Sequence, residues 1–141
     1  MKVSAKTDYA CIALLELSAS FPRDEPVRIR QIANDHKIPQ GFLVQILLQL
    51  KGAGLVASTR GASGGYQLTR PPEEITLREV IEVIEGPLDS APPTPFPSKA
   101  AEVLSSVWSD ITSCELTMLS EITFADLVER TQDAPEGMYY I

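Results

Sequence analysis

Three glycines within five residues constrain the fold of this chain more than any other feature of its sequence. They lie in RGASGGYQLTR, residues 60–70, between the strand-like runs LVAS and YQLT. Glycine adopts positive backbone torsions at little steric cost, so Gly61, Gly64 and Gly65 favour a tight bend between these runs. The stretch therefore predicts a β-hairpin with Arg60 near its tip.

The residues before the hairpin show helical periodicity. Residues 4–20 place apolar side chains on one face, and residues 28–36 make a short second helix. The turn KIP leads into a longer helix at about 40–53, which Gly52 and Gly54 end. Two helices joined by a tight turn, the second being the longer, form a helix-turn-helix. Followed by the hairpin, this order predicts a mainly α winged helix-turn-helix with a two-stranded β wing.

Further helices are expected after the hairpin. One begins at Thr76, where Glu79 lies at the position that completes a capping box. It ends at Gly86, and a proline-rich loop follows at 88–97. A short helix, FADLVER, is capped by Thr123 near the end of the chain.

Residues 98–121 predict a long helix whose apolar positions recur at intervals of 3, 4, 3 and 4, the spacing of a coiled-coil seam. The seam residues are Leu104, Val107, Ile111, Cys114 and Met118, with Trp108 beside them. The stripe packs either on its own chain or on a second copy. We favour a homodimer, because proteins that read two-fold symmetric DNA are themselves two-fold symmetric. The expected regions are thus a DNA-binding domain at 1–87, a loop at 88–97 and a dimerisation region at 98–141.

The charge of the chain is divided between its two parts. Residues 1–71 carry nine Lys/Arg and five Asp/Glu, a net charge of +4, whereas the remainder has a net charge of −11. A polyanion such as double-stranded DNA is attracted to the first part. Alternatively, the acidic helices serve only to keep a small protein soluble.

Two simpler expectations follow from composition. No stretch approaches the ~20 apolar residues that a membrane span needs, so we expect a cytoplasmic protein with no membrane partner. Cys11 and Cys114 lie far apart, without a disulfide framework, and are expected to be free thiols.

Four stretches together resemble the Rrf2 family of bacterial winged-helix transcription regulators. They are KTDYACIALLELS, IRQIANDHKIPQGFLVQILLQLKGAGLV, RGASGGYQLTRPPEEITLREVIEVIEGP and ITFADLV. The resemblance covers residues 1–87 closely and the long helix more loosely. It implies a dimeric, sequence-specific regulator of transcription, a repressor or an activator, that binds a palindromic operator. We expect a repressor.

The DNA-contacting residues follow from this resemblance and from side-chain chemistry. In the major groove we expect Gln40, Gly41, Val44, Gln45 and Gln49. Glutamine can bond two edges of adenine, and valine can contact a thymine methyl group. In the minor groove we expect Arg60 and Gly61, because a narrow tip with one arginine suits its negative potential. Contacts to phosphates are expected from Lys2, Lys6, Arg28, Arg30 and Lys51.

The sequence departs from the relatives that sense through an iron–sulfur cluster. Those relatives hold the cluster with three cysteines after the fourth helix, whereas residues 88–97 contain neither cysteine nor histidine. We expect no cofactor and no metal, since such clusters need several thiolates. Asp8, where some relatives supply a carboxylate ligand, is interpreted as a solvated helix residue. His36, the single histidine, is interpreted as a turn residue or a neighbour of phosphate.

The residues also bear on two other classes of function. The chain has no catalytic Ser/His/acid or Cys/His set and no phosphate-binding fingerprint, so it is not expected to be an enzyme. A winged-helix module that binds another protein, with weak or lost DNA binding, stays open, because Lys51 is the single cation on the second helix of the pair. For a regulator, the effector is expected to be a small molecule or a protein, or else oxidation of Cys114.

Overall fold

The computed structural model describes residues 1–23, 25–89 and 95–134. Its elements are, in chain order, α1 (Ala5–Ser20), η1 (Phe21–Arg23), α2 (Ile29–His36), α3 (Gln40–Gly52), β1 (Val56–Thr59), β2 (Gly65–Leu68), η2 (Pro72–Glu74), α4 (Leu77–Glu85), α5 (Lys99–Glu121) and α6 (Phe124–Asp133). The two strands form one antiparallel sheet. The mainly α architecture with a two-stranded hairpin is therefore confirmed.

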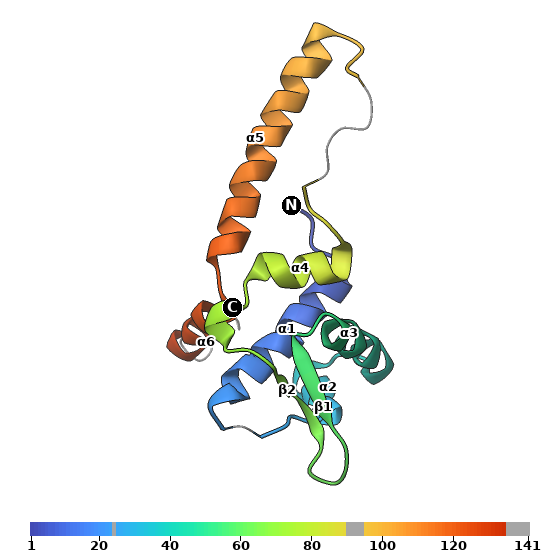
Figure 1. Ribbon diagram of the computed structural model, residues 1–141, viewed down its shortest axis with the longest axis vertical. Coiled ribbons are helices and arrows are strands. Elements are labelled where there is room, and N and C mark those ends of the chain that lie inside the picture. The colour runs from blue at the N-terminus through green and yellow to red at the C-terminus, as the bar shows by residue number, and fades with distance from the viewer. Residues whose placement is uncertain (24, 90–94, 135–141) are drawn as a thin grey trace, which may run out of the picture.

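The hydrophobic core is built around α1. It contains Leu14 of α1, Ile32 of α2, Leu43 of α3 and Ile75 before α4. All four residues are fully buried. Phe124, the first residue of α6, is also fully buried in this core. The last helix thus packs on α1 and shares the core of the first four helices (Figure 1).

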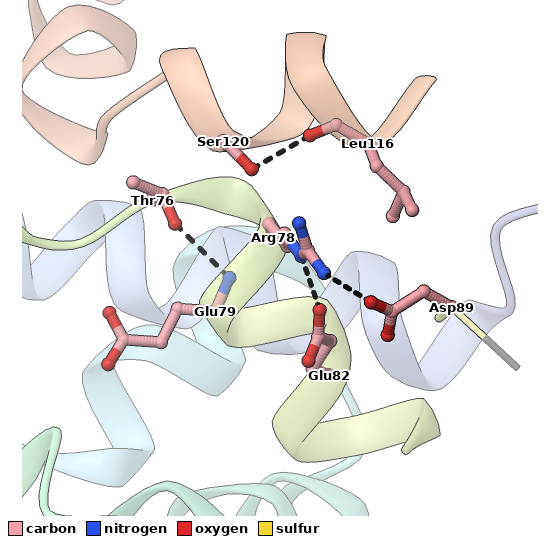
Figure 2. Close-up of polar contacts among 7 residues, drawn as sticks. All are labelled: Thr76, Arg78, Glu79, Glu82, Asp89, Leu116 and Ser120. Carbon is pink, nitrogen blue, oxygen red and sulfur yellow. Dashed lines mark hydrogen bonds and ion pairs between the residues drawn. The ribbon is translucent and has the colours of Figure 1, made fainter. Parts of the chain in front are cut away.

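The two predicted helix starts with threonine caps differ in outcome. Thr123 forms a complete capping box, because it accepts from the Asp126 amide while the Asp126 carboxylate accepts from the Thr123 amide. The capping box predicted at Thr76 is wrong. Thr76 accepts from the Glu79 amide, as Figure 2 shows, but the Glu79 carboxylate accepts from Arg70 Nη2 at 2.5 Å instead of turning back. The ion pair of Glu79 with Arg70, which follows β2, has replaced the second hydrogen bond of the capping box.

Arg78 links α4 to the start of the loop that follows it. Its Nε donates to Glu82 Oε1 at 2.5 Å and its Nη2 donates to Asp89 Oδ2 at 3.3 Å (Figure 2). The hydrogen bond to Glu82 raises the pKa of Arg78. This arrangement fixes the first residues of the loop against the helix.

The hairpin and α5 lie at opposite ends of the molecule (Figure 1). With 23 residues, α5 is about 35 Å long and projects from the core, which it meets near its carboxyl end. Within the described ranges, every helix is too short or too polar to cross a bilayer.

Candidate nucleic-acid interface

The turn between α2 and α3 depends on one residue with left-handed backbone torsions. Lys37 has φ 56° and ψ 43°, and its amide donates to the Ala33 carbonyl to end α2. Ile38 is buried directly after it, and Pro39 precedes the first turn of α3. The buried isoleucine holds the turn to the core and so sets the angle at which α3 leaves it.

One face of α3 is buried and the opposite face is open to solvent. The buried residues are Leu43, Ile46, Leu47 and Leu50. On a helix with 3.6 residues per turn, Gly41, Gln45 and Leu48 fall on the opposite side, and all three are exposed. Half-buried Val44 lies at the margin of this face. The exposed face presents one amide and two aliphatic side chains.

Each glycine of the hairpin tip has its own geometric reason. Gly61 has φ 104°, a backbone conformation in which a residue with a side chain would be strained. A Cβ on Gly64 would collide with the carbonyl oxygen of Thr59, and a Cβ on Gly65 would collide with the carbonyl oxygen of Val27. The second collision matters because Val27 and Tyr66 exchange two backbone hydrogen bonds of 2.8 Å. The glycines thus make a narrow tip and let the segment before α2 pair with β2.

The strands are shifted by one residue from their predicted positions. The predicted runs began at Leu55 and Tyr66, whereas β1 begins at Val56 and β2 begins at Gly65. The register pairs Val56 with Leu68 and Thr59 with Gly65, so Arg60 lies directly after the last pair, exposed at the tip.

A hollow of about 370 Å³ lies between the hairpin and the amino end of α2. Arg28, Ser58, Thr59 and Gly61 contribute to its lining. Nearby, Lys51 Nζ at the end of α3 donates to Ser58 Oγ at 2.7 Å. Hydroxyl groups and two cations therefore gather on the side of the hairpin next to the helix-turn-helix.

The structure brings some of the predicted contact residues together and separates others. The hollow has Arg28 and Gly61 in its lining and Lys51 next to it. Arg60 lies at the tip, and Arg30, the second residue of α2, is exposed. On α3, Gln40, Gly41 and Gln45 are exposed, whereas Val44 and Gln49 are half-buried. Lys2 and Lys6 belong to a different part of the molecule, at the amino end of α1.

That end of α1 is tied to α4 and α5. Ser4 Oγ and Thr7 Oγ1 donate to Glu85 Oε1 at 2.5 and 2.6 Å, and these hydrogen bonds lower the pKa of Glu85. The terminal amine of Met1 pairs with Glu115 of α5 at 3.0 Å. Lys6 is half-buried beside Glu85.

Sequence reasoning missed two residues of α3. Leu48 is 54% exposed on the outer face, and its position seven residues after Gly41 is a signal that the helical period supplies. Phe42 packs edge-on against Tyr9 of α1, with ring centroids 5.7 Å apart. That contact joins two distant parts of the sequence, so no local pattern indicates it.

The apolar stripe predicted on α5 is exposed. Leu104, Val107, Ile111 and Met118 are between 44% and 63% exposed, Trp108 is 60% exposed, and Cys114 is exposed between them. Leu119 is the one residue of α5 that is buried. Such a row of large apolar side chains on one helix marks an interaction surface.

The two cysteines differ in exposure, since Cys11 is half-buried and Cys114 is exposed. Burial, with the nearby charge of Asp8, raises the pKa of the Cys11 thiol to about 11. In the described ranges, no three His, Cys, Asp or Glu side chains are grouped so as to hold a metal ion. A chain with one half-buried thiol of raised pKa on α1 and one exposed thiol on α5 does not fit an iron–sulfur cluster.

His36 does not stand free in the turn. Its Nε2 lies 3.2 Å from Glu16 Oε2 on α1, and it lines a cavity with residues of α1 and α6. A carboxylate at this distance is an unsuitable neighbour for a phosphate group, so the phosphate-contact interpretation of His36 finds no support in the structure.

Comparison with protein families gives a match over most of the chain. The Rrf2 model, described as an iron-dependent transcriptional regulator, matches residues 3–130. The HTH-type transcriptional regulator CymR of Bacillus subtilis is 32% identical over 142 residues, covering 100% of each chain.

Two solved structures are similar to this one. The structure of CymR, the global cysteine regulator of B. subtilis, has a TM-score of 0.82 with 30% identity, covering 92% of this chain and 98% of that chain. The structure of T. potens IscR has a TM-score of 0.78 with 31% identity, covering 100% of this chain and 97% of that chain. The winged-helix assignment is confirmed by these matches, and the interpretation as a protein-binding module is not favoured.

Proposed function

The chain belongs to the Rrf2 family of helix-turn-helix transcription regulators, and on that premise we propose that it binds a palindromic operator as a homodimer and represses transcription. The observation that carries the dimer is the exposed apolar stripe on α5. It runs along a projecting helix at the end of the molecule opposite the hairpin (Figure 1). Two copies joined there leave both hairpins free for two half-sites.

In this proposal α3 enters the major groove with its outer face. Gln45 is the base-reading side chain with hydrogen-bonding groups on this face, and Val44 and Leu48 suit thymine methyl groups. Gly41 allows the backbone of α3 to approach the base edges closely, with Gln40 and Gln49 at the two sides. We therefore expect half-sites rich in A·T pairs under α3.

The hairpin supplies the minor-groove contact. Arg60 at the tip enters the groove, and Gly61 gives the tip its narrow width. Arg28 meets phosphates at the hollow beside it, and Lys51 does so next to Ser58. Arg30, exposed in the first turn of α2, meets a phosphate next to them. Lys2 and Lys6, at the amino end of α1, contact phosphates further along the duplex.

We propose that regulation does not pass through an iron–sulfur cluster, because the donor set does not fit one. An effector, a small molecule or a protein, then acts through the loop at 88–97, through α5 or through the cavity between α1 and α6 that His36 lines. Residues 1–87 serve DNA binding and residues 98–141 serve dimerisation. As a regulator of bacterial genes, the protein works in the cytoplasm.

Selection from random duplex DNA with the purified full-length chain tests the proposal, followed by titration of the selected sequence at two salt concentrations. We expect a two-fold symmetric motif and a log–log salt slope that falls by about 0.9 for each phosphate contact. A transcription assay with the motif placed across a promoter then tests repression. If a folded dimer enriches no motif at low salt, the operator-binding proposal is wrong.

A further inference from the structure

A cavity of about 260 Å³ lies away from the hairpin, between α1, the end of α2 and α6. Aliphatic side chains from α1 and α6 make most of its wall, among them Ile12, Leu15 and Val128. The polar residues of the lining are Glu16, His36, Thr131 and Gln132. An apolar pocket with a few polar groups is the usual form of a small-molecule site.

The size of the cavity limits what it can hold. An engineered cavity of about 150 Å³ in an unrelated protein binds benzene. The present cavity therefore has room for one aromatic ring, or a branched aliphatic group of similar size, with a short polar arm. Larger ligands would have to extend into solvent.

The charge of the cavity is set by one residue. Glu16 is the one residue among Asp, Glu, Lys and Arg in the lining. Its side chain is 26% exposed, and one oxygen, Oε2, lies 3.2 Å from the His36 ring. A carboxylate has two oxygens that accept hydrogen bonds, so Glu16 can take a second donor from a ligand.

We propose that this cavity binds a small organic cation, with an apolar body among the aliphatic side chains and an ammonium group on the Glu16 carboxylate. His36, the last residue of the first helix of the helix-turn-helix, lines the cavity together with residues of α1 and α6. The cavity is therefore placed to act as an effector site, a role that rests on the proposed function. The binding itself does not depend on that function, and the following test measures binding alone.

The probe is benzylamine, titrated into the ¹⁵N-labelled full-length protein and followed by amide chemical shifts. Benzyl alcohol and benzoate, of the same size, serve as the neutral and anionic comparisons. We expect saturable shifts at Ile12, His36 and Val128, and about fivefold tighter binding of benzylamine than of benzyl alcohol, the most that a partly exposed ion pair usually contributes. Benzoate should bind most weakly. Glu16→Gln should abolish the preference for the amine and leave benzyl alcohol binding unchanged.

A filling substitution separates this site from general surface binding. Ala19 is exposed at the edge of the cavity, so Ala19→Phe fills it without disturbing the core, whereas Ala5→Phe on the same helix is the matched control. We expect the first to abolish the shifts and the second to keep them. The proposal is overturned if benzylamine gives no saturable shifts, if Ala19→Phe leaves binding intact, or if benzoate binds as tightly.

Discussion

In the proposed homodimer, replacing Ile111 by glutamate should separate the two copies into monomers. Ile111 lies at the middle of the α5 stripe and is 48% exposed in the single chain. Full burial of an isoleucine side chain contributes about 1.5–3 kcal/mol, so the exposed half contributes about 1 kcal/mol in each copy. The two carboxylates introduced at a two-fold interface add at least about 1 kcal/mol each, because they lose water and repel one another. The total, about 4 kcal/mol, raises the dimer dissociation constant about a thousandfold.

Sedimentation equilibrium over a series of protein concentrations measures that constant directly. Ser106→Glu is the matched control, because it adds the same carboxylate to the opposite, exposed side of α5. Circular dichroism should show the same helical content in both variants, since Ile111 lies outside the core cluster. Operator affinity of Ile111→Glu should fall to that of a single half-site. The reasoning is refuted if Ile111→Glu stays dimeric at the concentrations where the parent does, or if Ser106→Glu weakens the dimer equally.

Three further results are expected. Arg60→Ala should weaken binding to the selected operator by about 1–3 kcal/mol in fluorescence anisotropy, and the exposed Arg130→Ala on α6 should not; equal affinity of Arg60→Ala and parent would exclude Arg60 from groove reading. Glu85→Gln should lower the melting temperature near neutral pH, and the difference from the parent should close as the pH falls through the unfolded-state pKa of about 4.3 and then the lower folded-state pKa. A difference that stays constant as the pH falls would contradict the assigned hydrogen bonds from Ser4 and Thr7. With a pKa raised to about 11, Cys11 should react with a thiol reagent at pH 8 roughly a hundredfold more slowly than free cysteine, measured in a Cys114→Ser background, and an equal rate would contradict the raised pKa.

Local sequence signals were sufficient where the determining contacts are local. The starts of α1, α3 and α5 were predicted to within one residue, because capping residues and proline act on the adjacent turn. The cap predicted at Thr123 was of this kind, and in the structure Asp126 completes it to a capping box. At Thr76 the same pattern failed, since the Glu79 carboxylate had a stronger partner in Arg70, nine residues earlier. The residues of one helical turn do not show that a cation following the hairpin, here Arg70, lies within reach of Glu79.

The same limit applies to the surroundings of His36. Nothing near it in the sequence indicates Glu16, which is twenty residues away and on another helix. The cavity beside this pair depends on α6, which joins the core through Phe124. Its position follows from the packing of three helices, and periodicity within any one of them does not define it.

Periodicity shows which residues share a face of a helix, but not what covers that face. On α3 the period separates a buried face from an exposed one. Leu48 is apolar and yet exposed, so apolar character alone does not place a residue in the core. On α5 the 3-4 spacing left two possibilities, packing within the chain or on a second copy. Among the described residues, the large exposed fractions of Leu104, Ile111 and Met118 argue against packing within the chain, because a stripe packed on its own chain would be buried. A two-fold partner is the simplest cover for so long a stripe, since each copy then buries the other's face with one and the same surface.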